Sequence, residues 1–254
     1  MQLIPGIAYQ PSAGERGTGD LYLPAAVDRA PLALFIHGGG WNSQDKSSFA
    51  GVAEFLCGLG FAVFNINYRL LSAGPWPLCG DDCLCAAEFL LHGSCAHLDR
   101  IDRSRLLVVG GSAGGHLALM TGLRLPREHV SAIVSISGVA DITLFPQQAE
   151  ARRQFFGGIP TAAEMRSAQP VELVRQDQPP VLLTHYRNDP VVPCTAAEHF
   201  AARTRAAGAE VEFYRYDCDT PDEGHSIWIP GSSPHRLFPD IEAAIARFLR
   251  TRLK

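Results

Sequence analysis

Hydrophobic and polar positions form a pattern that predicts strands and helices in alternation along the chain. Short apolar, β-branched or aromatic runs, typical of strands buried on both faces, cover residues 20–23, 32–36, 61–66, 106–109, 132–136, 181–184 and 211–216. Apolar residues at helical spacing cover residues 48–59, 82–91, 113–123, 195–207 and 241–253. This alternation predicts an α/β fold, in which helices cover both faces of a mostly parallel sheet.

The chain of 254 residues is long enough for one complete core, and it contains no internal repeat or clear linker. We therefore expect a single domain over residues 1–254. The one long connection between predicted strands, residues 141–180, mixes phenylalanines with polar residues and prolines. Segments at the carboxyl edge of a parallel sheet often cover the binding crevice, which predicts a small lid or pocket segment here. A surface helix with its own apolar face explains the pattern equally well.

A serine between glycines directly follows the apolar run 106–109. Residues 110–115 read Gly-Gly-Ser-Ala-Gly-Gly and lead into a predicted helix. A sharp turn between strand and helix exposes a serine hydroxyl at its tip, and the close approach of the neighbouring backbone requires glycine at Gly110 and Gly114. Ser112 is therefore the candidate nucleophile. Flexible connectors also contain serine and glycine, so the motif needs support from elsewhere in the chain.

A glycine-rich loop after another predicted strand gives that support. Residues 37–41 read His-Gly-Gly-Gly-Trp and follow the apolar run 32–36. Such a loop can direct backbone N–H groups at the negative oxygen that forms during acyl transfer. We expect an oxyanion hole built from the N–H groups of Gly39, Gly40 and Ala113.

Aromatic residues near these motifs are candidates for contact with a substrate. Trp41 could line the site or anchor the glycine loop in the core. Phe145 and Phe155 belong to the long segment that could form the pocket. We assign substrate binding to these three residues, whereas His37 would shape the glycine loop through its ring nitrogens.

A serine nucleophile needs a histidine base, and a carboxylate must hold that histidine in the correct tautomer. Asp189 follows the apolar run 181–184 in a loop that Pro190 and Pro193 would stiffen. This position makes Asp189 the first candidate for the acid. Asp141, after the preceding strand, is the alternative, and either aspartate could instead cap a helix or stabilise a turn.

Of the nine histidines, only His225 and His235 lie between the last predicted strand and the last predicted helix. His225 follows a glycine in a loop that could reach the serine, so it is the candidate base. His235 belongs to the approach to the last helix. His116, one turn after the serine, has the position of a packed helix residue.

Seven cysteines include a local group at Cys79, Cys83, Cys85 and Cys95. The group lacks a paired C-x-x-C arrangement and lies partly on a predicted helix, which favours reduced, buried thiols over a metal site or disulfides. We expect no bound metal.

Charge and hydropathy exclude some classes of binding partner. The formal net charge is −4, from 22 basic and 26 acidic residues without long runs, which argues against nucleic acid or an anionic membrane as a partner. No basic leader with an apolar stretch begins the chain, and no run approaches the ~20 apolar residues of a membrane span. We expect a cytoplasmic protein with a small-molecule ester or amide substrate. The sequence leaves open whether the protein forms a homo-oligomer.

These motifs together resemble the α/β-hydrolase superfamily, and within it the compact esterases and lipases with an HGGGW-type oxyanion loop. That group overlaps kynurenine-formamidase-like and hormone-sensitive-lipase-like enzymes. The resemblance covers most of the chain, at residues 20–24, 37–41, 67–70, 82, 86, 110–115, 189–193 and 224–226. It implies a central sheet of about eight strands, a triad of Ser112, Asp189 and His225, and hydrolysis without a cofactor.

Two positions and one segment length depart from the pattern of these relatives. Related formamidases commonly have tyrosine where this chain has Gly40, which favours other substrates. Tyr186 replaces the usual glycine before the acid loop, which affects the geometry of that loop. Only 36 residues precede the glycine loop, too few for the helical cap of the longer lipase-like enzymes. We therefore expect an open pocket and a small or exposed substrate.

Three functions fit the sequence. The first is a serine carboxylesterase for small or medium acyl esters, which works through an acyl-enzyme. The second is an arylformamidase, which uses the same residues to cleave an amide. The third is a non-catalytic binding protein with the same fold, although binding alone does not need a nucleophile, an acid, a base and a glycine loop together.

Overall fold

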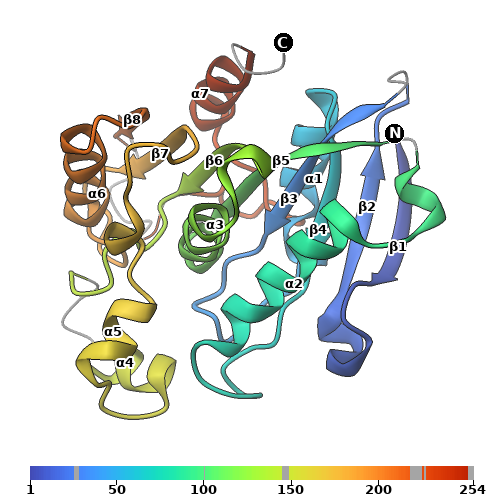
Figure 1. The fold of residues 1–254 in the computed structure, drawn as a ribbon. Helices are drawn as coiled ribbons and strands as arrows, with labels where there is room; N and C mark the ends of the chain where they lie inside the picture. The colour runs from blue at the N-terminus through green and yellow to red at the C-terminus, as the bar shows by residue number, and fades with distance from the viewer. Residues whose placement is uncertain (26–28, 100, 145–148, 218–224, 226, 251–254) are drawn as a thin grey trace.

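The computed structural model describes residues 1–25, 29–99, 101–144, 149–217, 225 and 227–250. Its central feature is an eight-stranded sheet with the strand order β1-β2-β4-β3-β5-β6-β7-β8 (Figure 1). The β1–β2 and β2–β4 pairs are antiparallel, and the other pairs are parallel. The strands are β1 (Gln2–Ala8), β2 (Thr18–Leu23), β3 (Ala30–Ile36), β4 (Ala62–Ile66), β5 (Ile101–Gly111), β6 (Val130–Ile136), β7 (Val181–Tyr186) and β8 (Val211–Tyr216).

Helices cover both faces of this sheet. The α-helices are α1 (Ala50–Gly58), α2 (Leu78–His92), α3 (Ala113–Arg124), α4 (Ala149–Phe156), α5 (Ala162–Ser167), α6 (Cys194–Ala206) and α7 (Pro239–Arg250). Helices α1 and α7 pack on one face, and α2, α3 and α6 pack on the other (Figure 1). The sheet is therefore the middle of three layers, as the sequence pattern predicts.

Side chains that alternate along the strands supply both layers of the core. In β3, Leu32 and Leu34 belong to the apolar cluster under α2, α3 and α6, whereas Ala33 and Phe35 belong to the cluster under α1 and α7. All four side chains are fully buried. A strand buried on both faces needs an unbroken apolar run, and this is the pattern that predicts these strands from sequence.

Each predicted strand and helix is present, and the fold prediction is confirmed. The last three residues of the predicted helix 241–253 lie outside the described residues. The eight-stranded sheet also agrees with what the resemblance implies. Strand β1 is a strand that the hydrophobic pattern missed. Pro5 and Gly6 interrupt it, and the register with β2 shifts between Ile4 and Ile7. Gly6 has a φ of 69°, and its N–H donates to the Asp20 carboxylate at 2.8 Å. This edge strand is irregular, which is why it lacks a strand signature.

The segment 141–180 contains α4, α5 and a short 3₁₀ helix (Pro170–Leu173). Phe155 and Phe156 of α4 are buried, and the Phe155 carbonyl accepts a hydrogen bond from the Trp76 N–H at 2.8 Å. Ile159, between the two helices, is 81% exposed. The segment thus presents an apolar helix face to the body of the protein, and its role as a lid stays a prediction.

The cysteines that the structure describes are free thiols: Cys57, Cys79, Cys83, Cys85, Cys95 and Cys194. Burial inside α2 raises the pKa of the Cys79 thiol to about 12. Buried thiols of this kind are weakly reactive because the thiolate is the nucleophile. None of the described helices has the length and apolar content needed to cross a membrane.

Candidate active site

Ser112 lies in the tight turn between β5 and α3. Its φ of 55° and ψ of −122° are rare for a residue with a side chain, and its N–H donates to the Ile136 carbonyl on neighbouring β6 at 2.8 Å. A backbone held in such a conformation stores strain, which is common where a side chain must be presented for chemistry. Ser112 thus has the geometry of the nucleophile in a strand–turn–helix elbow.

The flanking glycines are required by this geometry. A Cβ atom on Gly110 would lie 2.1 Å from the Gly114 carbonyl oxygen. A Cβ atom on Gly114 would lie 2.1 Å from the Ile36 carbonyl oxygen. Both distances are far below any possible contact, so the predicted need for glycine at these two positions is confirmed.

The glycine loop lies directly beside this elbow, since a Cβ atom on Gly38 would be 3.2 Å from the Ser112 Cβ. Gly39 and Gly40 have φ values of 105° and 59°, which glycine adopts easily. Within the described part of the chain, their N–H groups donate to no acceptor. Ala113 is the first residue of α3, so its N–H has no acceptor inside the helix. Three backbone donors are therefore available next to the serine.

His37 sits behind the glycine loop and does not face the cavity. Its ring stacks on Tyr68 with 4.3 Å between ring centroids, and its Nδ1–H donates to the Gly38 carbonyl at 2.7 Å. Burial lowers the pKa of His37 to about 4, so the ring is neutral near pH 7. This geometry agrees with a role in shaping the loop.

Asp189 and His225 form a carboxylate–histidine pair. The His225 Nδ1–H donates to Asp189 Oδ2 at 2.7 Å, and the carboxylate is completely buried. This contact fixes the tautomer in which Nε2 carries no proton and can accept one. The His225 Nε2 atom is itself buried and has no partner in the described part of the chain.

The loop that carries Asp189 is held from several sides. Its second carboxylate oxygen, Oδ1, accepts hydrogen bonds from the N–H groups of Val191 and Val192, both at 2.9 Å. His185, at the end of β7, donates from Nε2 to the Val192 carbonyl at 2.8 Å. Burial lowers the pKa of His185, so this second histidine stays neutral and acts as a donor.

The alternative acid, Asp141, has other partners. Its Oδ2 accepts from His199 Nδ1 at 2.6 Å, and its Oδ1 accepts from Gln169 and Thr143. Although burial alone would raise it, these hydrogen bonds give Asp141 a lowered pKa. These contacts tie Asp141 to His199 on α6 and to Gln169, whereas His225 donates to Asp189.

A cavity of about 380 Å³ opens at the serine. Ser112, Ala113 and His225 contribute to its lining together with Gly39 and Gly40. The sequence-predicted nucleophile, base and oxyanion donors are therefore brought to one place, with Asp189 directly behind the base. Its volume is in the range of pockets for small molecules.

The other walls of the cavity are mainly aromatic. Phe49 and Trp228 line it, and the ring centroids of these two residues are 4.8 Å apart. His235 also lines the cavity and stacks on Trp228 at 5.6 Å, so it is more than part of the approach to the last helix. Sequence reasoning missed Phe49 and Trp228 as wall residues, because no local pattern links two residues that lie so far apart in the chain.

The three residues assigned to substrate binding have different positions. Trp41 lines the cavity. Phe155 lies behind it, with 4.6 Å between the two ring centroids, and is only 1% exposed. Phe145 lies outside the described residues. His116 packs edge-on against Trp41 and donates from Nε2 to the Ala168 carbonyl at 2.9 Å, as expected for a packed helix residue.

The sheet order, the serine elbow and the carboxylate–histidine pair after β7 define an α/β-hydrolase. The chain belongs to the BD-FAE family, whose family model matches residues 19–204. This membership confirms the predicted superfamily.

Comparisons with individual proteins agree with this assignment. The chain is 29% identical over 226 residues to the "Probable carboxylic ester hydrolase LipM" of Mycobacterium tuberculosis, covering 80% of this chain and 51% of that protein. It is 28% identical over 224 residues to Esterase LipC of the same organism, covering 78% and 53%. The chain thus spans about half the length of these curated relatives.

A solved structure shares the fold along nearly the whole chain. It is the truncated form of a carbohydrate esterase from gut microbiota, with a TM-score of 0.84 and 22% sequence identity. The match covers 99% of this chain and 96% of that one. The fold is therefore that of a known esterase structure.

Proposed function

We propose that the protein is a serine hydrolase that cleaves small or medium carboxylic esters through an acyl-enzyme. The observation that carries the proposal is the convergence on one cavity of a serine in a strained turn, a histidine held by a buried carboxylate, and backbone donors that have no acceptor among the described residues. A binding protein needs none of these features. The names of the curated relatives, which are ester hydrolases, also support it.

In this mechanism Ser112 Oγ attacks the ester carbonyl, and its proton passes to His225 Nε2. Asp189 holds the imidazole and stabilises the imidazolium. The N–H groups of Gly39, Gly40 and Ala113 donate to the negative oxygen of the tetrahedral intermediate. When the intermediate collapses, the C–O bond to the alcohol breaks and His225 returns the proton to the departing alcohol.

Water then completes the cycle. It attacks the acyl carbonyl while His225 takes one of its protons, and the second tetrahedral intermediate uses the same oxyanion donors. Collapse releases the carboxylic acid and returns the proton to Ser112 Oγ. These steps balance with protein groups and water, so the proposal includes no cofactor or metal.

The walls of the cavity support a substrate of limited size. A volume of about 380 Å³ accommodates a small acyl group together with a compact alcohol. Trp41, Phe49 and Trp228 offer apolar and aromatic surface to either group. We assign direct substrate contact to Trp41, and we assign Phe155 to its support because Phe155 is buried behind it.

We also propose a cytoplasmic location for the protein. The free thiols of the described chain, of which Cys79 and Cys83 are buried in α2, fit a reducing compartment. Fractionation of cells that express the complete natural protein tests this proposal, and recovery in a membrane or secreted fraction would contradict it.

The decisive experiment compares p-nitrophenyl esters of increasing acyl length with an aryl formamide, using the wild type and Ser112→Ala. We expect Ser112-dependent turnover that is fastest for short acyl chains, and stoichiometric labelling of the wild type by an organophosphonate. Full labelling of Ser112→Ala would rule out this nucleophile. Formamide turnover far above every ester would assign an amidase, and no turnover with any substrate would favour the binding protein.

A further inference from the structure

The backbone is irregular over residues 41–49, from the last residue of the glycine loop to the residue before α1. Trp41 and Gln44 have φ values of 59° and 71°, in the left-handed region that residues with side chains rarely adopt. The segment begins next to the candidate oxyanion donors and ends at Phe49 in the cavity wall. A strained conformation persists only where the surrounding structure holds it, so this segment needs an external anchor. The Trp41 carbonyl accepts from the Leu71 N–H, and the Gln44 carbonyl accepts from Arg16 Nη1, both at 2.9 Å.

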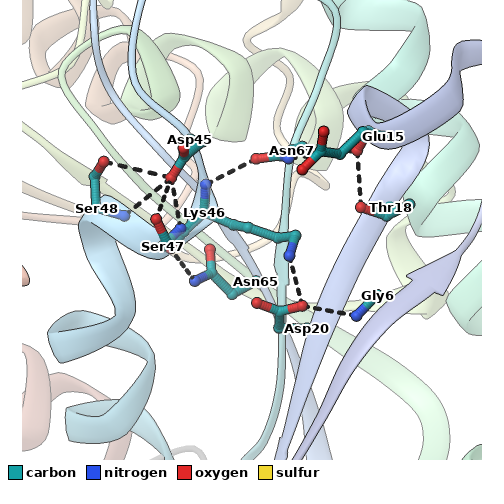
Figure 2. A network of polar contacts seen from close by, with 10 residues as sticks. All are labelled: Gly6, Glu15, Thr18, Asp20, Asp45, Lys46, Ser47, Ser48, Asn65 and Asn67. Atoms are coloured by element: carbon teal, nitrogen blue, oxygen red, sulfur yellow. Dashed lines mark hydrogen bonds and ion pairs between the residues drawn. The ribbon is translucent and has the colours of Figure 1, made fainter.

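Lys46 adds the ties to the sheet, through three polar groups (Figure 2). Its Nζ donates to Asp20 Oδ1 at 2.6 Å, its backbone N–H donates to Asn67 Oδ1 at 2.8 Å, and its carbonyl accepts from Asn65 Nδ2 at 2.7 Å. Asp20 lies on β2, Asn65 lies on neighbouring β4, and Asn67 follows the end of β4. One residue of the loop is thus tied to two strands of the sheet.

The partners of Lys46 are themselves fixed. Asp20 Oδ1 also accepts from the Gly6 N–H on β1, and the Asn67 carbonyl accepts from the Tyr9 hydroxyl at 2.7 Å. Asp20, Asn65 and Asn67 are all buried. Buried polar groups that share several hydrogen bonds in a rigid sheet hold a bound residue in one position.

The same anchor continues to the cavity wall. Asp45 caps the short 3₁₀ helix that ends at Phe49, because its Oδ1 accepts from the N–H groups of Ser47 and Ser48 at 2.8 and 3.1 Å (Figure 2). The Ser48 carbonyl in turn accepts from the His235 N–H at 2.8 Å. A shift at the anchor would therefore be transmitted toward both the oxyanion donors and the aromatic wall.

We infer that Lys46 is a positioning residue for the oxyanion hole. Its ties to β2 and β4 hold the glycine loop so that the N–H groups of Gly39 and Gly40 meet the oxyanion of the tetrahedral intermediate. This inference rests on the proposed function. A salt bridge that only stabilises the fold would change the amount of folded enzyme, whereas a positioning residue changes the rate of each correctly folded molecule.

The first test is Lys46→Met, which keeps the length of the side chain and removes the ammonium group. Active sites are counted by organophosphonate titration, so that unfolded molecules do not enter the rate. We expect kcat per titrated site to fall roughly tenfold with KM within about twofold, less than the ~10²–10³ seen when a donor is removed outright. A trifluoromethyl ketone, which forms a tetrahedral oxyanion on the serine, should bind more weakly by the same factor as kcat/KM.

Asp20→Asn is the second variant, because it preserves the shape of the site and keeps an acceptor for the Gly6 N–H. We expect a smaller fall in kcat, because the new amide oxygen still accepts from Lys46 Nζ without the charge. The double variant should be no worse than Lys46→Met alone, since both changes act on the same Nζ–Oδ1 contact. The matched control is Arg103→Met. Arg103 is a partly buried cation that ties β5 to the Leu90 carbonyl of α2 at 2.6 Å, so its loss should lower the melting temperature and leave kcat per site unchanged.

The outcomes separate the two proposals. If the wild type is active and both Lys46→Met and Asp20→Asn keep its kcat per site, the positioning role is overturned and the proposed function is not. Equal losses of kcat in Arg103→Met would also overturn the positioning role, because the effect would then be a general loss of stability. Absence of Ser112-dependent turnover in the wild type would overturn the proposed function, and the positioning role with it.

Discussion

Two buried aspartates follow neighbouring strands, and their hydrogen bonds separate their roles. Asp189 holds His225 in the tautomer that leaves Nε2 free to take a proton. Asp141 holds His199, whose side chain is 47% exposed on α6. Sequence order alone left both aspartates open as the acid, because each follows a strand and precedes the candidate base. Only the contacts of the folded chain distinguish them.

We predict that Asp189→Asn lowers kcat by about 10⁴, because an asparagine amide favours the wrong imidazole tautomer. Asp141→Asn is the matched control, since it removes an equally buried carboxylate that pairs with a different histidine. It should keep kcat within about threefold and lower the unfolding free energy by about 1–3 kcal/mol. Steady-state kinetics and urea unfolding of both variants measure this. Equal loss of kcat in the two variants would contradict the assignment of the acid.

Glycine at position 110 is predicted to be irreplaceable for steric reasons. In Gly110→Ala the new Cβ would lie 2.1 Å from a carbonyl oxygen, so the elbow must distort. We expect a loss of at least about 2 kcal/mol in unfolding free energy. Gly58→Ala is the control, because no atom lies within 4 Å of the new Cβ and the position is in α1. It should be neutral or stabilising by up to about 1 kcal/mol. The urea midpoints of the two variants decide the question.

At the scale of elements, the sequence predicts what burial dictates. The strands β3 to β7 are apolar on both faces and gave clear signals, as did the longer helices. Strand β1 gave none, since Pro5 and Gly6 belong to a register shift at an edge. Helix α2 begins at Leu78, four residues before its predicted start, because a glycine and polar residues obscure its first turn. Edges and helix ends depend on contacts with other elements, which a local pattern does not contain.

The candidate site also has residues that the sequence predicts and residues that it does not. Ser112, Asp189 and the glycine loop occupy turns directly after strands, so their order along the chain predicts where they meet. The cavity wall combines Phe49 and Trp228 from distant segments. No local pattern links such residues, because the packing of whole segments brings them together. The role of His185 in holding the acid loop was missed for the same reason.

His116 connects α3 to the segment 141–180 through its bond to the Ala168 carbonyl, and this link predicts a pH dependence. Burial lowers the pKa of His116 to about 4, from 6.5 in the unfolded chain. Between these values the unfolded chain binds a proton that the native state does not, so stability falls as the pH is lowered. From pH 7 to pH 5 this histidine should cost about 2 kcal/mol.

Urea unfolding at pH 7 and pH 5 measures this dependence in the wild type and in His116→Gln. Glutamine can keep a donor to the Ala168 carbonyl and does not titrate, so the variant should lose about 2 kcal/mol less than the wild type over this range. His37, whose pKa burial also lowers to about 4, continues to contribute in both proteins. An identical pH dependence in the two proteins would show that His116 is not the titrating group.

At the scale of the whole molecule, one aromatic cluster joins segments that are far apart in the sequence. Phe155 of α4 contacts Trp41 beside the glycine loop, Trp76 before α2 and His116 of α3, with ring centroids 4.6, 5.4 and 5.7 Å from its own. The segment 141–180 therefore contacts the cavity wall through Trp41. None of its described residues lines the cavity directly.

We therefore expect Phe155→Ala to affect both stability and substrate binding. Loss of the buried ring should lower the unfolding free energy by about 3–5 kcal/mol, and Trp41 can then move into the vacated space. KM should rise for the best ester. The kcat per titrated site should change little, because the glycine loop keeps its ties through Lys46. Ile159→Ala is the control on the same segment, 81% exposed and expected to be neutral within about 0.5 kcal/mol. If Phe155→Ala lowered kcat per site as strongly as Lys46→Met, the cluster would be positioning the oxyanion donors as well as the wall.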